Sequence, residues 1–213
     1  MTNLEDALLA VDAGADAVGF VFYKKSPRYL SMEAARQIVQ QLPTHIEKVG
    51  VFVNEGADTL CECAERAGLS AIQMHGNRED PHVADLVKAR HPELKVFAAI
   101  SMAHHSPDTW AMTWRPDIVH AFLVDSGNGS NPGGTGKTFD WKTSGPIVEN
   151  IKAKGKVVAA GGLTPENVID ALNTLKPWGV DVVSGVELSP GKKDAEKVRA
   201  FVRAVQAADR KGG

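Results

Sequence analysis

The stretch AVGFVFYKKSPRYLSMEAARQIVQQLPTHIEKVGVFV, residues 17–53, places two short apolar runs on either side of an amphipathic segment. The apolar runs, 17–23 and 48–53, are rich in Val and Phe and predict strands that are buried on both faces of a parallel sheet. The segment 31–42 between them predicts a helix. Together they predict a βαβ unit with a right-handed crossover.

The same alternation continues along the rest of the chain, so the repeat defines the whole fold. No low-complexity linker or change of composition interrupts it, which predicts one domain over residues 1–213. Thr164-Pro165 predicts the start of one helix, as an N-cap followed by proline. Further strands are predicted at 71–75, 95–100, 119–125, 156–160 and 180–184, and further helices at about 3–13, 57–67, 79–90, 107–112, 144–153, 165–176 and 192–208.

The predicted elements comprise eight helices but seven strands, and the chain opens on a helix. A (β/α)₈ TIM barrel begins with a strand. The predicted fold class is therefore α/β, a (β/α)₈ barrel with strand 1 missing from this chain. The alternative is an open doubly wound sheet, but no G-x-G-x-x-G turn follows a first strand here.

Composition excludes several classes of protein. Lys and Arg number 24 against 26 Asp and Glu, a net charge of −2, which is too balanced for a dedicated nucleic-acid binder or an acidic disordered chain. Cys61 and Cys63 lie one residue apart on a predicted helix and point in different directions, so we expect two ordinary thiols and no metal site. The low cysteine content, with no signal-like or membrane-spanning apolar run, predicts a cytoplasmic protein.

Chemically useful side chains follow the predicted strands, where a barrel carries its active site. Asp125 ends a buried strand, and partial desolvation would suit its carboxyl to acid–base work; bracing a loop is the alternative. Arg28, in the loop after the first predicted strand, has a guanidinium suited to a carboxylate or phosphate, unless it belongs to a solvated basic cluster. His75 ends another strand, where a structural histidine is the commoner interpretation.

Glycine-rich segments indicate a phosphorylated ligand. Gly161-Gly162 and Ser184-Gly185 follow the last two predicted strands, which is where such barrels bind phosphate through backbone N–H groups. The loop 126–137 carries five glycines and predicts a mobile loop that closes over a ligand. Its end, 136–138, has part of a nucleotide-binding P-loop, but Asn131 replaces the first glycine and no helix follows, which excludes a nucleoside triphosphatase.

Seven segments resemble the phosphoribosylanthranilate isomerase family of tryptophan biosynthesis and together span most of the chain. The resemblance implies a (β/α)₈ barrel that converts N-(5-phosphoribosyl)anthranilate to a 1-deoxyribulose phosphate by an Amadori rearrangement, without metal or organic cofactor. The segments are DALLAVDAGADAVGFVFYKKSPRYL, VGVFVNE, IQMHG, FLVDS, GGTGKTFDW, AAGGLTPENV and GVDVVSGVELSPGKKD.

The resemblance also implies roles for individual residues. Asp125 matches the general acid that protonates the furanose oxygen, and Arg28 matches the arginine that holds the anthranilate carboxylate. His75 and Asp181 take supporting roles in substrate binding. The phosphate-binding residues are Gly161, Gly162, Ser184 and Gly185.

The sequence departs from the family at its beginning. The family opens with a strand Lys-Ile-Cys-Gly, whose Cys is the general base, and Met1-Thr2-Asn3 match the residues just after that glycine. Cys61 and Cys63 cannot substitute, because their helix should lie outside the barrel. We therefore expect residues 1–213 alone to be inactive and poorly folded.

Two other functions remain open. One is the sugar-phosphate isomerase of histidine biosynthesis, which performs the same chemistry on another aglycone. The other is a non-catalytic module that binds a phosphorylated ligand. We expect a small phosphorylated molecule as partner, no nucleic acid or membrane, and a monomer or homodimer.

Overall fold

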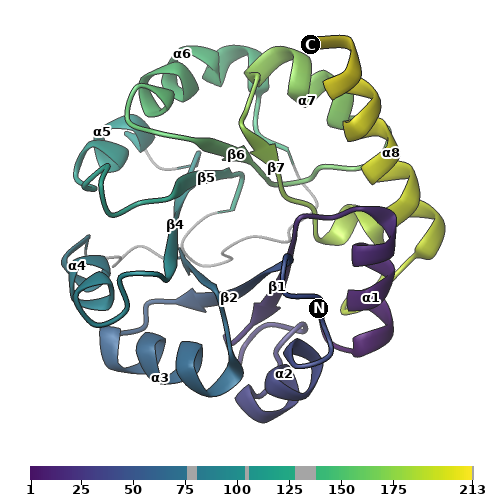
Figure 1. The fold of residues 1–213 in the computed structure, drawn as a ribbon. Coiled ribbons are helices and arrows are strands. Elements are labelled where there is room, and N and C mark those ends of the chain that lie inside the picture. Colours follow the sequence, from purple (N-terminus) through teal and green to yellow (C-terminus); the bar gives the residue numbers. More distant parts are fainter. Residues whose placement is uncertain (76–80, 104–105, 128–137, 213) are drawn as a thin grey trace.

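A computed structural model describes residues 1–75, 81–103, 106–127 and 138–212. Within these residues the main sheet has seven parallel strands, and the main helices around it number eight, as the sequence predicts (Figure 1). The strands are β1 Ala17–Val21, β2 Glu47–Val53, β3 Ala71–His75, β4 Lys95–Ser101, β5 Ala121–Asp125, β6 Val157–Ala159 and β7 Gly179–Val180. The helices are α1 Leu4–Ala13, α2 Met32–Val39, α3 Ala57–Ala67, α4 Pro81–Arg90, α5 Pro107–Met112, α6 Trp141–Lys152, α7 Val168–Leu175 and α8 Ala195–Gly212.

The strands lie side by side in the order of the sequence, from β1 to β7. A doubly wound sheet reverses its strand order at a switch point, and this order has no reversal. The sheet curls, and the helices form a ring around its outer face (Figure 1). The doubly wound alternative is therefore wrong, and the architecture is of the TIM-barrel type.

The sheet curls without closing among the described residues. β1 pairs with β2, and β7 pairs with β6, but β1 and β7 do not pair with each other in that part of the chain. The amino-terminal residues lie beside β1: the Met1 amino group donates to the Gly19 carbonyl, and the Thr2 hydroxyl donates to the Gly191 carbonyl. Helices α1 and α8 pack together outside this part of the sheet (Figure 1).

Large side chains fill the space between the strands and the helices. The sheet contributes Phe20, Ile72, Ile100 and Phe122, which are almost completely buried, because parallel strands covered by helices carry apolar residues on most positions. Cys61 and Cys63 are buried free thiols on α3. None of the described helices is long and apolar enough to span a membrane.

The carboxyl-terminal third departs from prediction in detail. Helix α7 begins at Val168 rather than at 165, because the Thr164 hydroxyl and the Asn167 side chain hold a separate turn there: the Glu166 N–H donates to Thr164 Oγ1 at 3.2 Å. The strand predicted at 180–184 ends at Val180. A 3₁₀ turn (Ser184–Val186) and a two-stranded hairpin, β8 Glu187–Ser189 with β9 Lys192–Lys193, occupy the following residues, so helix α8 begins three residues late.

Candidate active site

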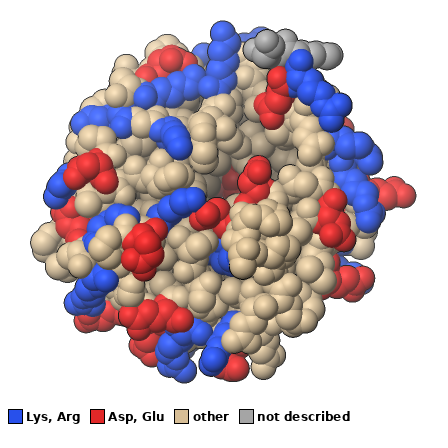
Figure 2. Space-filling view, viewed as in Figure 1, with Lys and Arg blue, Asp and Glu red and all other residues tan. Residues whose placement is uncertain are grey.

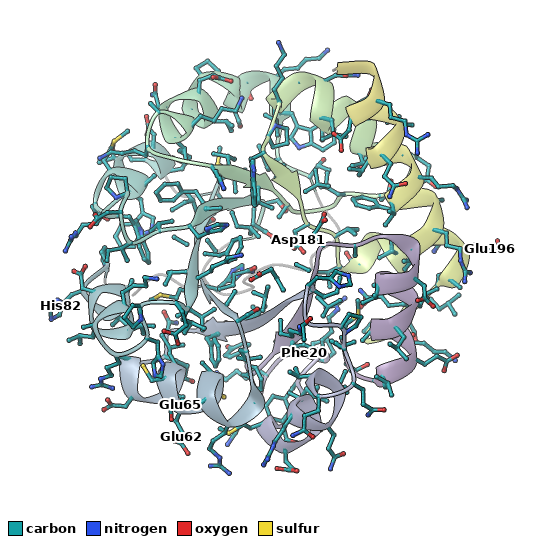
Figure 3. All side chains as sticks on the ribbon, viewed as in Figure 1. Phe20, Glu62, Glu65, His82, Asp181 and Glu196 are labelled. Atoms are coloured by element: carbon teal, nitrogen blue, oxygen red, sulfur yellow. The ribbon has the colours of Figure 1, made fainter. Side chains whose placement is uncertain are left out.

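Three of the predicted site residues lie where strands end. His75 is the last residue of β3, Asp125 is the last residue of β5, and Asp181 directly follows β7. Since these three strands belong to one parallel sheet, their carboxyl ends lie at the same rim of the curled sheet. Asp181 lies inside the ring of helices in Figure 3, whereas Glu62 and Glu196 lie on its outer surface.

Asp125 is held firmly by the backbone around it. All five residues of β5 are buried, and Asp125 pairs with Ser101 of β4 in the sheet register. Its carbonyl accepts from the Met102 N–H at 2.8 Å, and its carboxylate Oδ1 accepts from the Gly127 N–H at 2.5 Å. The Asp125 carboxyl therefore has a defined orientation at the rim. The predicted mobile loop, 126–137, lies outside the described residues except for Ser126 and Gly127.

His75 is buried near Asp125. Burial lowers the pKa of His75, and the negative charge of Asp125 opposes this only in part. The imidazole is therefore neutral at pH 7 and can donate through one nitrogen and accept through the other. The Gln73 side-chain amide lies against His75 Nε2, which fixes the orientation of the ring.

Asp181 has the most perturbed carboxyl of the described residues at this rim. Burial raises its pKa to about 6, and the nearby charge of Asp125 adds to the increase, while Lys193 opposes it. Two carboxyl groups in one poorly solvated region do not both ionise easily. With its pKa raised to about 6, Asp181 can hold or release a proton close to neutral pH, which is what acid–base catalysis needs.

The two predicted phosphate-binding segments lie against each other. Gly161 and Gly162 both have positive φ, 80° and 65°, and a Cβ on Gly161 would lie 2.6 Å from the Ser126 backbone nitrogen. A Cβ on Gly185 would lie 1.9 Å from the carbonyl oxygen of Leu163. Both contacts need glycine, because only a residue without a side chain permits these backbone approaches. The structure thus brings the two loops together beside Asp125.

Arg28 is not part of a solvated surface cluster. Its side chain is 14% exposed and forms a two-pronged ion pair with Glu187: Nε lies 2.9 Å from Oε1, and Nη2 lies 2.6 Å from Oε2. Lys193 Nζ lies 3.4 Å from Glu187 Oε1. The pair joins the loop after β1 to the β8–β9 hairpin.

Sequence reasoning missed Glu187 and Lys193 as site residues. Both belong to the segment GVELSPGKKD, but Glu187 is separated from Arg28 by 159 positions, and a single sequence carries no signal for that contact. Among the described residues, no group of three or more His, Cys, Asp or Glu side chains could hold a metal ion. On the face seen in Figure 2, basic and acidic side chains alternate, in keeping with the small net charge.

Comparison with known proteins identifies a family. The model of the family described as N-(5'phosphoribosyl)anthranilate (PRA) isomerase matches residues 1–204. An N-(5'-phosphoribosyl)anthranilate isomerase of Geobacter sp. (strain M21) is 45% identical over 203 residues, which are 95% of this chain and 93% of the relative.

Two solved structures resemble the fold closely. One is a monomer form of dimeric phosphoribosylanthranilate isomerase from Thermotoga maritima, with 38% identity, a TM-score of 0.83, and coverage of 97% of this chain and 95% of that one. The other is a phosphoribosyl anthranilate isomerase in complex with reduced 1-(o-carboxyphenylamino)-1-deoxyribulose 5-phosphate, with 38% identity, a TM-score of 0.82 and the same coverage.

Proposed function

The chain belongs to the N-(5'-phosphoribosyl)anthranilate isomerase family, and we propose how its own residues perform that reaction. The enzyme is an isomerase of tryptophan biosynthesis that converts N-(5-phosphoribosyl)anthranilate to 1-(2-carboxyphenylamino)-1-deoxyribulose 5-phosphate. The observation that best supports a mechanism is the placement of the Asp125 carboxyl. The Gly127 N–H orients it, and its charge acts on both His75 and Asp181.

Asp125 is the general acid of this mechanism. Its acid form donates a proton to the furanose ring oxygen, the bond from that oxygen to C1′ breaks, and a Schiff base forms between C1′ and the anthranilate nitrogen. Removal of the C2′ proton then gives an enaminol, which becomes the ketone product when C1′ gains a proton. His75 and Asp181 contact the substrate beside the reacting carbons.

The two ends of the substrate are held by different parts of the rim. Backbone N–H groups of Gly161, Gly162, Ser184 and Gly185 bind the phosphate. The three glycines have no side chain, which allows a phosphate oxygen to approach the backbone. The Arg28 guanidinium binds the anthranilate carboxylate. Two free thiols fit a reducing cytoplasm, where we infer that the enzyme acts as a monomer or a homodimer.

Turnover also needs a base for the C2′ proton, and we infer that an eighth strand between β1 and β7 carries it. Both strands have an open edge among the described residues, and the family base is a cysteine at the end of such a strand. Cys63 cannot replace it, because it lies on α3, and burial and Glu62 raise the pKa of its thiol to about 11. That residues 1–213 alone are inactive and poorly folded stays a prediction.

Carbon-13 NMR of the substrate carbons tests this proposal, because the product has a ketone at C2′ and the substrate does not. Residues 1–213 are compared with the same chain preceded by a strand that ends in Cys-Gly. The extended chain should convert the substrate about 10²- to 10⁴-fold faster, and Asp125→Asn in it should lower the rate by a similar factor. A serine in place of the added cysteine is the matched control.

Each other outcome has a distinct meaning. A folded extended chain that converts only the histidine-pathway substrate would identify the related isomerase instead. Binding of the product without turnover would indicate the non-catalytic module. Equal rates with and without the added strand would refute the eighth-strand inference and leave the isomerase function intact.

A further inference from the structure

The Glu187 carboxylate is surrounded by hydrogen-bond donors from three residues, Arg28, Gly191 and Lys193. Arg28 donates from Nε at 2.9 Å and from Nη2 at 2.6 Å, the Gly191 N–H donates at 3.3 Å, and Lys193 Nζ lies at 3.4 Å. The Glu187 side chain is 5% exposed. A carboxylate with this many donors has its acceptor capacity filled, so it is fixed in one orientation.

The ion pair leaves one side of Arg28 unused by Glu187. Glu187 occupies the edge of the guanidinium formed by Nε and Nη2. A planar guanidinium has a second edge, formed by its terminal nitrogens, which matches a carboxylate in the same two-pronged way. With the first edge held, the second edge points in a fixed direction and loses little side-chain entropy on binding a ligand.

Lys193, which contacts Glu187 together with Arg28, is itself held by other parts of the chain. Lys193 Nζ donates to the Val183 carbonyl at 3.0 Å, and the Lys193 backbone N–H donates to Asp6 Oδ2 at 2.9 Å. Asp6 is buried on α1, where it also accepts from the Asn3 side chain. Arg28 is thus connected through Glu187 and Lys193 to a helix, and not only to a loop.

We propose that Glu187 is a positioning residue that holds Arg28 so that the second edge of the guanidinium binds the carboxylate on the aromatic ring of the substrate. Glu187 touches no reacting atom and acts only through Arg28. This inference rests on the proposed function and assigns to Glu187 the discrimination between carboxylated and uncarboxylated ligands.

Calorimetric binding to the chain tests the proposal with two probes. The first is reduced 1-(o-carboxyphenylamino)-1-deoxyribulose 5-phosphate, and the second is the same molecule without the ring carboxylate. Glu187→Gln should weaken binding of the first probe roughly tenfold to hundredfold, because the guanidinium is no longer held in place, and change binding of the second less than about twofold. Glu47→Gln is the matched control, since Glu47 pairs with Lys95 at 2.8 Å at the start of β2.

A double-mutant cycle separates positioning from a general structural role. If Glu187 acts through Arg28, Glu187→Gln should have no further effect on the first probe in an Arg28→Ala background. Additive losses, or equal losses for both probes, would overturn the proposal. If Glu187→Gln does not melt cooperatively, Glu187→Asp replaces it as the test variant. Its shorter side chain should also weaken binding of the first probe and leave binding of the second nearly unchanged. Absence of binding of either probe by the folded unmutated chain would instead remove the proposed function, and this inference with it.

Discussion

The two sides of the sheet are built differently. From β2 to β5 the strands pair over long, continuous registers, such as Val49–Val53 with Ala71–His75 and Phe97–Ser101 with Ala121–Asp125. In β6, β7 and the β8–β9 hairpin, to which Arg28 joins the loop after β1, the strands are short. β6 and β7 share only Val158 with Gly179 and Ala159 with Val180. Backbone ladders and an apolar core hold the first side, which we call the long-strand side. Side-chain ion pairs and close glycine contacts hold the second, which we call the short-strand side.

The difference coincides with a division of labour. The long-strand side contributes Asp125 and His75, whose positions follow from strand pairing. The short-strand side contributes Arg28, Ser184 and Asp181, which follow or precede irregular segments. A rigid acid thus faces a ligand-binding surface that is held by polar side chains. Strand pairing thus fixes the position of the group that transfers the proton, whereas individual side-chain contacts fix the positions of the ligand-binding loops.

Truncation of a core residue on each side should give the largest contrast in stability. Ile72 is fully buried in β3, so Ile72→Ala should lower the free energy of unfolding by about 2–5 kcal/mol through lost burial and a cavity. Val180→Ala in β7, where the side chain is half-buried, should cost less than about 1.5 kcal/mol. Urea denaturation measures both. Equal losses would mean that the two sides are packed alike.

The strands of the long-strand side can be predicted from short stretches of sequence. From β1 to β6, each apolar run that predicts a strand, such as 71–75, is found as one, because continuous burial on both faces requires continuous apolar residues. Strand order then follows from the βαβ alternation, and it places Asp125 and His75 at the same rim. These features need no knowledge of distant contacts.

The irregular part depends on contacts that sequence spacing does not reveal. The β8–β9 hairpin is held by Glu187 and Lys193, whose partners Arg28 and Asp6 lie far away along the chain. The start of α7 shifted because Asn167 and Thr164 bond each other, which the Thr-Pro pattern alone does not show. Prediction therefore succeeded on the long-strand side and lost accuracy on the short-strand side, for the same physical reason that distinguishes them.

A methyl group at Gly185 should test the glycine contacts of the short-strand side. The added Cβ would overlap the Leu163 carbonyl oxygen, and both groups belong to backbone that cannot rotate away. Gly185→Ala should cost about 1–3 kcal/mol in the free energy of unfolding. Gly56→Ala, where a Cβ meets nothing within 4 Å, is the control and should change stability by less than about 0.5 kcal/mol. Urea denaturation that gives similar values for both would contradict the close packing of the two loops.

Removal of the Asp181 charge should change stability by an amount that depends on pH. The pKa of Asp181 is raised to about 6 in the folded chain from an ordinary 3.8, first by burial and then by Asp125. The neutral carboxyl is compatible with burial, so the folded chain is most stable below the unfolded pKa of Asp181. That stability is lost as pH rises through 6, because the folded chain must then hold a buried charge. Asp181→Asn should therefore raise the free energy of unfolding by about 1–3 kcal/mol at pH 7.5, and the difference from the unmutated chain should vanish towards pH 3.8.

Urea denaturation at several pH values measures this difference, with the exposed Asp12→Asn on α1 as a control that should stay within about 0.5 kcal/mol throughout. A loss of stability at pH 7.5 would mean that Lys193 outweighs burial and Asp125. Asp181 would then belong with Glu187 among the carboxylates that hold the short-strand side together. A gain would mean that the chain keeps a destabilising carboxyl opposite Asp125, which is the expected signature of a group retained for chemistry rather than for folding.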